Sequence, residues 1–197
     1  MKSLQLSKPH LIVMVGLPGA GKTFFANHFA ETFHAPLVSW QSIRTELFNE
    51  PTYTKDEDAI VERIASQQLG ELLKTGATTI HEGGSLVYAY RQALTKQATE
   101  QGYDVLFVWV QTDPAAAKNR ALKQRQFTAE MFADQSRRFT ALKSSEQFVV
   151  ISGKHTYASQ LKIVLRRLSQ PHQQEVERVH ASRQESQSRP GRTITIR

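Results

Sequence analysis

One stretch, residues 16–23, constrains the fold more than any other part of the chain. It reads Gly-Leu-Pro-Gly-Ala-Gly-Lys-Thr, follows the apolar run 11–15 and precedes the segment 24–29. A strand that leads into a glycine-rich turn and then a helix directs several backbone N–H groups at one point, which attracts phosphate. The glycines allow positive φ and close approach to a ligand, while Pro18 stiffens the turn. This G-x-x-x-x-G-K-[ST] pattern predicts a nucleoside triphosphate site.

Two side chains of this loop have expected roles. Lys22 is expected to reach the β- and γ-phosphates, and the hydroxyl of Thr23 is expected to ligate Mg²⁺. The alternative is a glycine-containing turn with no ligand, but every motif position is filled and both flanks fit. The motif does not indicate which reaction follows. The predicted nucleotide-binding residues of the loop are Gly16, Leu17, Pro18, Gly19, Ala20, Gly21, Lys22 and Thr23.

The alternation of apolar runs with helical segments predicts the fold class. Five short runs, at 11–15, 37–39, 78–80, 105–110 and 148–151, are apolar or β-branched and contain no charged residue. Strands of this kind, separated by helical crossovers, form parallel sheets that are covered on both faces. We therefore expect an α/β, three-layer P-loop NTPase fold with a five-stranded parallel sheet and a helical lid. Ligands in such folds bind at the carboxyl ends of the strands.

Composition limits the organisation of the chain. With 197 residues, 40% of them hydrophobic, it can form one sizeable domain, which we expect over 1–169 with a lid at about 114–143. Residues 170–197 are polar and basic, which predicts a disordered tail. There is no cysteine, which excludes disulfides and zinc-thiolate sites. No apolar run approaches the roughly 20 residues of a membrane span, so we expect a soluble, cytoplasmic protein.

Positive charge is concentrated in the predicted lid. The net charge is +7, and residues 115–143 carry seven basic residues against only Glu130 and Asp134. An excess of this kind favours an anionic partner, which could be a nucleotide, an acidic substrate or nucleic acid. The basic residues of the segment are Lys118, Arg120, Lys123, Arg125, Arg137, Arg138 and Lys143.

Polar residues follow the predicted strands, and they give the chain a family likeness. Gln41 and Arg44 follow the second strand, Glu82 ends the third, and the basic lid follows the fourth. With these residues and the phosphate loop, residues 11–168 resemble the P-loop kinases of the polynucleotide kinase and zeta toxin-like group, which are AAA-type ATP-binding proteins. The resemblance implies that Gln41 and Arg44 bind the substrate and that Glu82 holds Mg²⁺ through a water molecule.

The same resemblance assigns roles to the lid and to the turn after the fifth strand. Arg120 and Arg125 are similar to the lid arginines that close over the triphosphate and stabilise charge on the transferring group. Gly153 and Lys154 occupy the place where related kinases surround the adenine. Ordinary alternatives stay open: Glu82 as a solvated or helix-capping carboxylate, and the arginines as a solvated basic face.

The chain departs from the family at one position. The family pattern D-x-x-R reads here Gln41-Ser42-Ile43-Arg44, so the arginine is kept and the general base is lost. Glutamine cannot accept a proton at neutral pH. Either Glu82 acts as the base, or the loose transition state of phosphoryl transfer needs positioning and charge neutralisation more than a base.

The leading functional hypothesis is an ATP-dependent kinase with Mg²⁺ as cofactor and a hydroxyl of a small molecule or nucleic-acid end as acceptor. Its predicted catalytic residues are Lys22, Glu82, Arg120 and Arg125. An ATP hydrolase or nucleotide-dependent switch is the alternative that the absent aspartate favours. A nucleic-acid-binding module that retains ATP binding is the third possibility. His81 is expected to be packed or solvated rather than catalytic, and Trp40 could either pack in the core or stack on a flat substrate.

Overall fold

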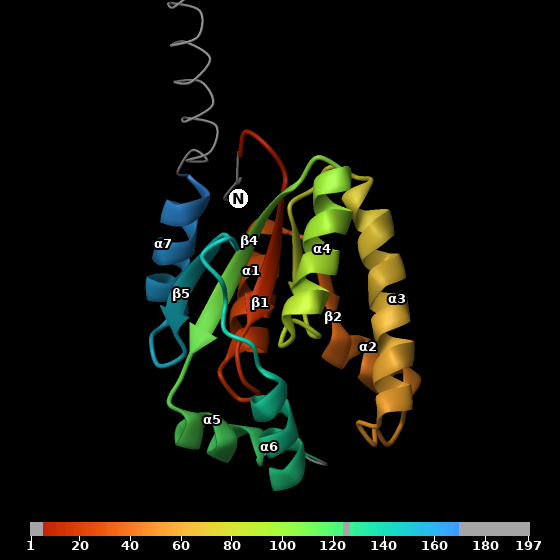
Figure 1. Cartoon of the computed structure of the whole chain (residues 1–197). Helices are drawn as coiled ribbons and strands as arrows, with labels where there is room; N and C mark the ends of the chain where they lie inside the picture. Colours follow the sequence, from red (N-terminus) through yellow and green to blue (C-terminus); the bar gives the residue numbers. More distant parts are fainter. Residues whose placement is uncertain (1–5, 124–126, 170–197) are drawn as a thin grey trace, which may run out of the picture.

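The computed structural model describes residues 6–123 and 127–169 of the chain (Figure 1). Arg125 and the predicted tail 170–197 lie outside the described residues. Five strands form one parallel sheet in the order β2-β3-β1-β4-β5. The strands are β1 (His10–Val15), β2 (Leu37–Ser39), β3 (Thr79–Glu82), β4 (Asp104–Gln111) and β5 (Phe148–Ser152). This confirms the predicted α/β fold with a five-stranded parallel sheet.

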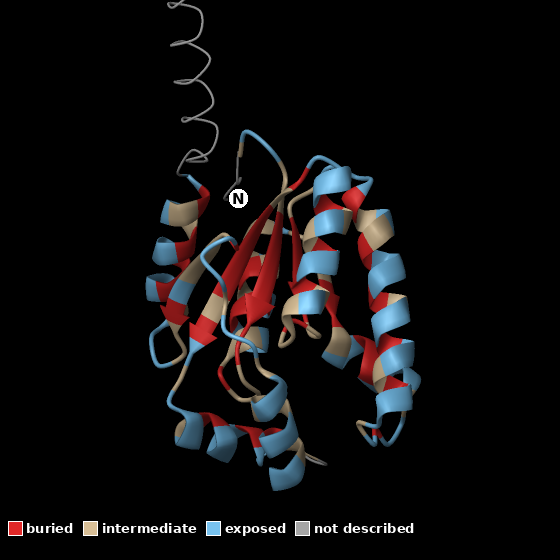
Figure 2. Ribbon diagram, in the orientation of Figure 1, coloured by how far each residue is buried: buried red, intermediate tan, exposed pale blue. Residues whose placement is uncertain are grey.

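Helices cover both faces of the sheet, and two more project beyond the carboxyl ends of its strands (Figure 1). The central strand β1 shows why, because Leu11 and Val13 point into one core while Ile12 and Met14 point into the other. Figure 2 shows this buried sheet between exposed helix surfaces. The helices are α1 (Lys22–Phe33), α2 (Trp40–Leu47), α3 (Lys55–Leu73), α4 (Tyr88–Glu100), α5 (Pro114–Ala121), α6 (Ala129–Arg138) and α7 (Tyr157–Leu168).

The third strand is longer than the sequence predicts. The apolar run suggests a strand over 78–80, but β3 continues to Glu82. The two polar residues at its end are paired on both sides: Glu82 lies opposite Met14 of β1 and Ser39 of β2. The backbone ladder therefore extends past the apolar pattern, with both side chains buried and the Glu82 carboxylate accepting a hydrogen bond from Ser39 of the neighbouring strand.

The spacing of Thr54 and Glu57 in the sequence predicts a capping box at the start of α3, with Glu57 as part of the helix cap, but this box is only half present. The Thr54 hydroxyl accepts from the backbone N–H of Glu57, as the pattern predicts. The Glu57 carboxylate, however, accepts from the backbone N–H groups of Thr52 and Tyr53, each at 2.7 Å. Glu57 therefore orders the loop before α3 instead of closing the helix end on itself.

The two projecting helices, α5 and α6, form the predicted helical lid, with a small core of Ala117, Ala121 and Phe132. Its trailing end is held by Arg91 of α4, which is fully buried. The Arg91 guanidinium contacts the Glu146 carboxylate at 2.6 Å and donates to the backbone carbonyls of Thr140, Ala141, Ser85 and Leu86. Arg91 thus joins the segment after α6 to the loop between β3 and α4.

Candidate nucleotide and acceptor site

The phosphate loop has the backbone geometry that its glycines permit. Gly16 has φ 144° and Gly19 has φ 74°. A side chain at Gly16 would overlap the carbonyl oxygen of Val110, and one at Gly19 would overlap that of Ala117 in α5. Among the described residues, no side chain caps the first turn of α1, which begins at Lys22. The N–H groups at this helix end are therefore available to an anionic ligand.

Lys22 and Thr23 lie where the loop enters α1. The Lys22 ammonium donates to the carbonyl oxygens of Gly16 (2.9 Å) and Leu17 (3.0 Å). Burial lowers the pKa of Lys22, and the negative charge of Glu82 partly offsets this effect. The Thr23 hydroxyl donates to Glu82 Oε1 at 3.2 Å. Residues 59 positions apart in the sequence thus meet at the carboxyl edge of the sheet.

Glu82 is held by two hydroxyl groups. Thr23 donates to one carboxylate oxygen and Ser39 donates to the other at 3.0 Å. Ser39 was not among the residues predicted for the site, although its position at the end of β2 could have indicated it. Its hydroxyl also accepts from the N–H of Ser42 and so caps α2. Glu82, Thr23 and Ser39 form one chain of hydrogen bonds that runs from the exposed Thr23 to the buried Ser39.

This oxygen set fits Mg²⁺. A carboxylate and a hydroxyl are hard donors of the kind Mg²⁺ prefers, and the ion is commonly bound by one or two protein oxygens together with substrate phosphates and water. Over residues 6–123 and 127–169, no group of three or more histidine and acidic residues could hold a metal by itself. Glu82 and Thr23 beside the phosphate loop are therefore the residues that would hold the ion.

His81 precedes Glu82 and plays a packing role, as expected from the sequence. Its side chain is fully buried, with Nε2 at 3.1 Å from the carbonyl oxygen of Gly83 and 3.3 Å from the Tyr90 hydroxyl. Burial lowers the pKa of His81 to about 4, so the ring is neutral at physiological pH. Trp40 also packs, because it lies against Gly83 and Gly84 and meets Tyr90 edge-on.

Arg44 is occupied by contacts within the protein. It is 4% exposed, contacts the carboxylates of Glu57 at 3.5 Å and Asp58 at 2.6 Å, and lies 4.7 Å from the ring centre of Tyr53. Burial alone would raise the pKa of Glu57, but hydrogen bonds from Thr52 and Tyr53 and the charge of Arg44 lower it on balance. The described contacts of Arg44 therefore fasten α2 to α3.

Gln41, the other predicted substrate residue, is exposed at the start of α2. Its amide nitrogen donates to the Tyr53 hydroxyl at 3.3 Å. Gln41 and Arg44 thus both contact Tyr53, a residue that the sequence did not single out. The signal that could have indicated Tyr53 is its place directly before the Thr54 cap, where the chain turns.

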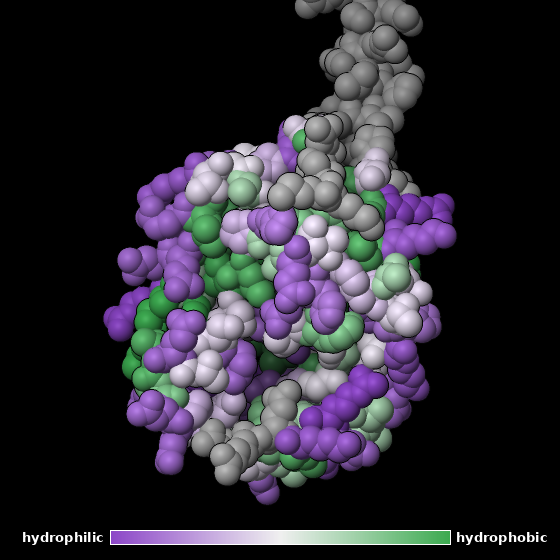
Figure 3. Space-filling model, turned by 180° about the vertical axis from the view of Figure 1, so that it is seen from behind, coloured by the Kyte–Doolittle hydropathy of each residue, from purple (hydrophilic) through white to green (hydrophobic). Residues whose placement is uncertain are grey.

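The lid approaches the phosphate loop through Arg120 and Gly153. Arg120 is exposed on α5, and its guanidinium donates to the Gly153 carbonyl oxygen at 3.2 Å. A side chain at Gly153 would overlap the carbonyl oxygen of Ala20 and the hydroxyl of Thr112. Lys154 is exposed beside them. The structure thus brings Arg120, Gly153 and the loop together. Seen from behind, the molecule has a hollow in its lower half (Figure 3).

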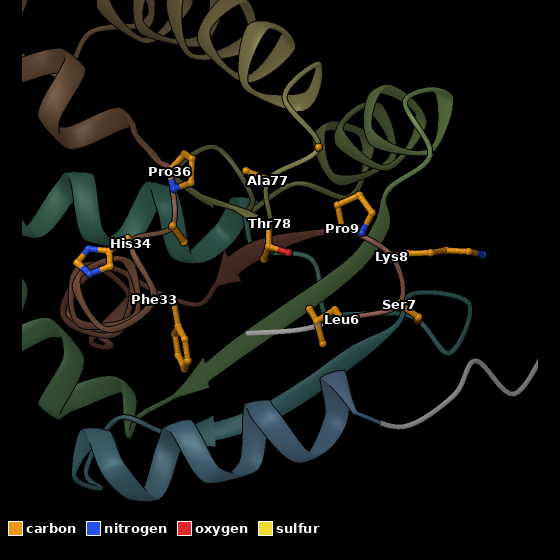
Figure 4. Close-up of a pocket in the computed structure, with 11 residues that line it drawn as sticks. Leu6, Ser7, Lys8, Pro9, Phe33, His34, Pro36, Ala77 and Thr78 are labelled. Carbon is orange, nitrogen blue, oxygen red and sulfur yellow. The ribbon is translucent and has the colours of Figure 1, made fainter. Parts of the chain in front are cut away.

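A separate cavity of about 390 Å³ lies at the opposite end of the sheet (Figure 4). It is lined by residues 6–9, 33–36 and 76–78, and no acidic side chain faces it. It therefore lacks the donor set that a nucleotide and its metal ion require.

The sheet order and the phosphate loop define a P-loop fold with a kinase-type architecture. Residues 11–145 match the family described as an AAA domain, and the chain belongs to this family. No curated protein sequence matches it. No helix of the described part of the chain is long and apolar enough to cross a membrane.

Solved structures of kinases have the same fold. A sugar kinase from Janibacter sp. HTCC2649, without ligand, has a TM-score of 0.63 at 19% identity, over 82% of this chain and 94% of that chain. A gluconokinase from Sinorhizobium meliloti 1021 has a TM-score of 0.61 at 17% identity, over 92% and 98%. The Mycobacterium tuberculosis APS kinase, in complex with AMPPNP and APS, has a TM-score of 0.61 at 18% identity, over 83% and 99%.

Proposed function

We propose that this protein transfers the γ-phosphoryl group of ATP to a hydroxyl group of a small molecule or a nucleic-acid end. The observation that carries the proposal is the hydrogen bond between Thr23 and Glu82, which joins the phosphate loop to the acidic end of β3. The kinases among the structural neighbours support it. The resemblance to the polynucleotide kinase and zeta toxin-like group supports a hydroxyl acceptor.

Each residue of the nucleotide side has a role in this proposal. The loop N–H groups and Lys22 hold the phosphates, while Thr23 and Glu82 hold Mg²⁺. When bound, Mg²⁺ neutralises charge on the phosphates. Arg120, with Arg125 from the same lid, stabilises the negative charge of the transferring group. Gly153 and Lys154 contact the adenine.

The proton of the acceptor hydroxyl needs no protein base in this scheme. Gln41 cannot take it, and both carboxylate oxygens of Glu82 already accept hydrogen bonds. The acceptor oxygen forms a bond to the γ-phosphorus, the bond to the β-γ bridging oxygen breaks, and ADP leaves. The proton passes to a phosphate oxygen or to solvent, which the loose transition state tolerates.

ATP hydrolysis without an acceptor is the second candidate. Its support is Gln41, because an exposed amide stands where the related kinases have an aspartate base. In that case water takes the place of the acceptor hydroxyl, and the amide would orient it. The basic lid leaves nucleic-acid binding as a third possibility, which steep salt dependence would indicate.

Labelled ATP tests these candidates directly. The protein is incubated with γ-labelled ATP and Mg²⁺ and a panel of nucleosides, oligonucleotide ends and sugars, and both transfer and phosphate release are counted. We expect transfer to one acceptor class. Lys22→Ala should lower the transfer rate about 1,000-fold or more, because the phosphates lose the positive charge of Lys22. Lys96→Ala, on the exposed side of α4, is the matched control. Phosphate release that no acceptor alters would favour the hydrolase, and an unchanged Lys22→Ala variant would contradict both.

A further inference from the structure

Two aromatic rings meet between the acceptor side and the lid. Tyr53 belongs to the loop before α3, and Phe127 lies just before α6. Their ring centres are 6.1 Å apart and the rings are nearly perpendicular, at 89°. Segments that are far apart in the sequence therefore place two aromatic surfaces together in front of α2.

The backbone at Tyr53 is held in an uncommon conformation. Its φ of 55° lies in the left-handed region, which costs a residue with a bulky side chain of order 1 kcal/mol. The Glu57 carboxylate maintains it by accepting the N–H groups of Tyr53 and Thr52. The Arg44 guanidinium covers one face of the ring. Strain that is fixed in this way is typical of ligand-binding positions.

Tyr53 also contacts the residue at the expected position of the acceptor hydroxyl. Gln41 donates its amide N–H to the Tyr53 hydroxyl, which leaves the amide oxygen as an acceptor of hydrogen bonds. Gln41 follows Ser39 by two residues, and Ser39 is bonded to Glu82. The start of α2 therefore carries both a contact with Tyr53, through Gln41, and a contact with Glu82, through Ser39.

The charges around this pair of rings cancel. Arg44 is matched by the carboxylates of Glu57 and Asp58. Burial raises the pKa of Asp58, and the charges of Arg44 and Arg138 oppose that rise, so Arg138 is a second cation near this carboxyl group. Among the described charged groups beside Tyr53, two arginines and two carboxylates carry no net positive charge. Tyr53 and Phe127 offer aromatic surface to an acceptor, and Gln41 offers an amide group.

We propose that Tyr53, Phe127 and Gln41 form the acceptor subsite, and that the acceptor is an uncharged molecule with a planar ring close to its hydroxyl group, as in a nucleoside. This inference rests on the proposed kinase function. The ring of the acceptor stacks on one of these two perpendicular rings and meets the other edge-on, and the amide of Gln41 hydrogen-bonds to its polar edge. A sugar acid, by contrast, carries a negative charge and has no planar ring to pack against Tyr53 and Phe127.

The test compares acceptors and variants under the same conditions. Transfer from ATP is measured with adenosine, guanosine, cytidine and uridine, and with gluconate and ribose. At least one nucleoside is expected to exceed gluconate by about 10-fold or more in kcat/KM. Stacking contributes about 1–3 kcal/mol per base, so Tyr53→Leu and Phe127→Ala should each raise the nucleoside KM about 10-fold while the KM for ATP stays unchanged.

Two controls isolate the aromatic contacts. Tyr53→Phe keeps the ring and should keep the nucleoside KM within about threefold, since only one neutral hydrogen bond is lost. Tyr88→Leu removes a tyrosine from α4, which packs near Lys143 and away from Gln41, and should leave the KM unchanged. An unchanged ATP KM in Tyr53→Leu shows that the variant is folded.

The possible outcomes separate the two proposals. Preferred transfer to gluconate or ribose, unaffected by Tyr53→Leu, would overturn the acceptor inference and leave the kinase intact. If no acceptor is labelled, the kinase proposal fails, and nucleoside binding in the presence of AMPPNP is measured instead. Binding that Tyr53→Leu weakens would still support the subsite, whereas no nucleoside binding would overturn it.

Discussion

The nucleotide side and the acceptor side of this protein are built in different ways. The centre of the nucleotide side is one continuous loop, residues 16–23, to which β3 adds the Glu82 carboxylate. The acceptor side needs Gln41, Arg44 and Tyr53, each with partners from other segments. Backbone geometry fixes the phosphate loop, whereas an ion-pair cluster fixes the acceptor side. The spacing of residues in the sequence therefore predicts local geometry better for the phosphate loop than for the acceptor side.

The strongest test of this contrast is Arg44→Met. The change leaves the carboxylates of Glu57 and Asp58 without their cation and removes the group that covers Tyr53, so we expect the free energy of unfolding to fall by about 4 kcal/mol. Urea denaturation measures it, with the exposed Arg137→Met as control. A variant of wild-type stability that has lost only acceptor turnover would instead make Arg44 a substrate-binding residue.

The second test concerns His81, on the strand that serves both sides. Its pKa falls from 6.5 to about 4 on folding, so the unfolded chain binds the proton more readily. Stability is complete above pH 6.5, falls as the pH decreases toward 4, and is lower by about 3 kcal/mol below that. Urea unfolding between pH 4 and pH 7 should show this slope. His81→Gln should flatten it, whereas the exposed His155→Gln should not.

The third test addresses the nucleotide side alone. Glu82→Gln keeps the size of the side chain and removes the charge that would hold Mg²⁺. Transfer or hydrolysis should fall about 100-fold, because a metal site depends on its carboxylate ligand. The rate is measured over a range of Mg²⁺ concentrations. Wild-type rates at low Mg²⁺ would exclude Glu82 from the metal site.

The smallest effect is expected for Ser39, which donates a hydrogen bond to Glu82 on the nucleotide side and caps α2 on the acceptor side. Ser39→Ala removes a helix cap and a hydrogen bond to Glu82, and should cost about 1 kcal/mol of stability and about 10-fold in Mg²⁺ affinity. Thr156→Ala removes the equivalent cap of α7, whose hydrogen bond goes to Ser159 and does not involve Glu82. It should lower stability equally and leave Mg²⁺ affinity unchanged. Equal Mg²⁺ affinities in the two variants would reduce Ser39 to a helix cap.

The sequence predicted the fold and the course of the phosphate loop because both depend on local patterns, while the nucleotide-binding roles of the loop residues stay predictions. Uniformly apolar strands and their crossovers indicate a parallel sheet, and the phosphate loop is contiguous. Ser39 was missed because its contact with Glu82 depends on the register between β2 and β3. Tyr53 was missed because nothing in its neighbours specifies a left-handed backbone; the partner that fixes it, Glu57, was interpreted as a helix cap.

The acceptor side shows why a motif residue can be kept while its surroundings change. Arg44 has the spacing of the family arginine, but two acidic residues at the start of α3 take up its charge. Sequence reasoning had no means to pair residues from two separate helices. The Arg44 guanidinium points toward α3 because of the way α2 packs against α3. The spacing of residues 41 and 44 in the sequence does not encode that packing.

The buried contact between Arg91 and Glu146 gives the two ends of the lid unequal freedom. Its trailing end is bound through Thr140 and Ala141 to the body of the molecule, whereas its leading helix has the exposed Arg120 contact with Gly153. Because only Thr112 and Asp113 separate α5 from β4, the leading end is tied to the sheet by its backbone instead of by buried charge. Loss of the contact between Arg91 and Glu146 should therefore loosen the trailing end of the lid first.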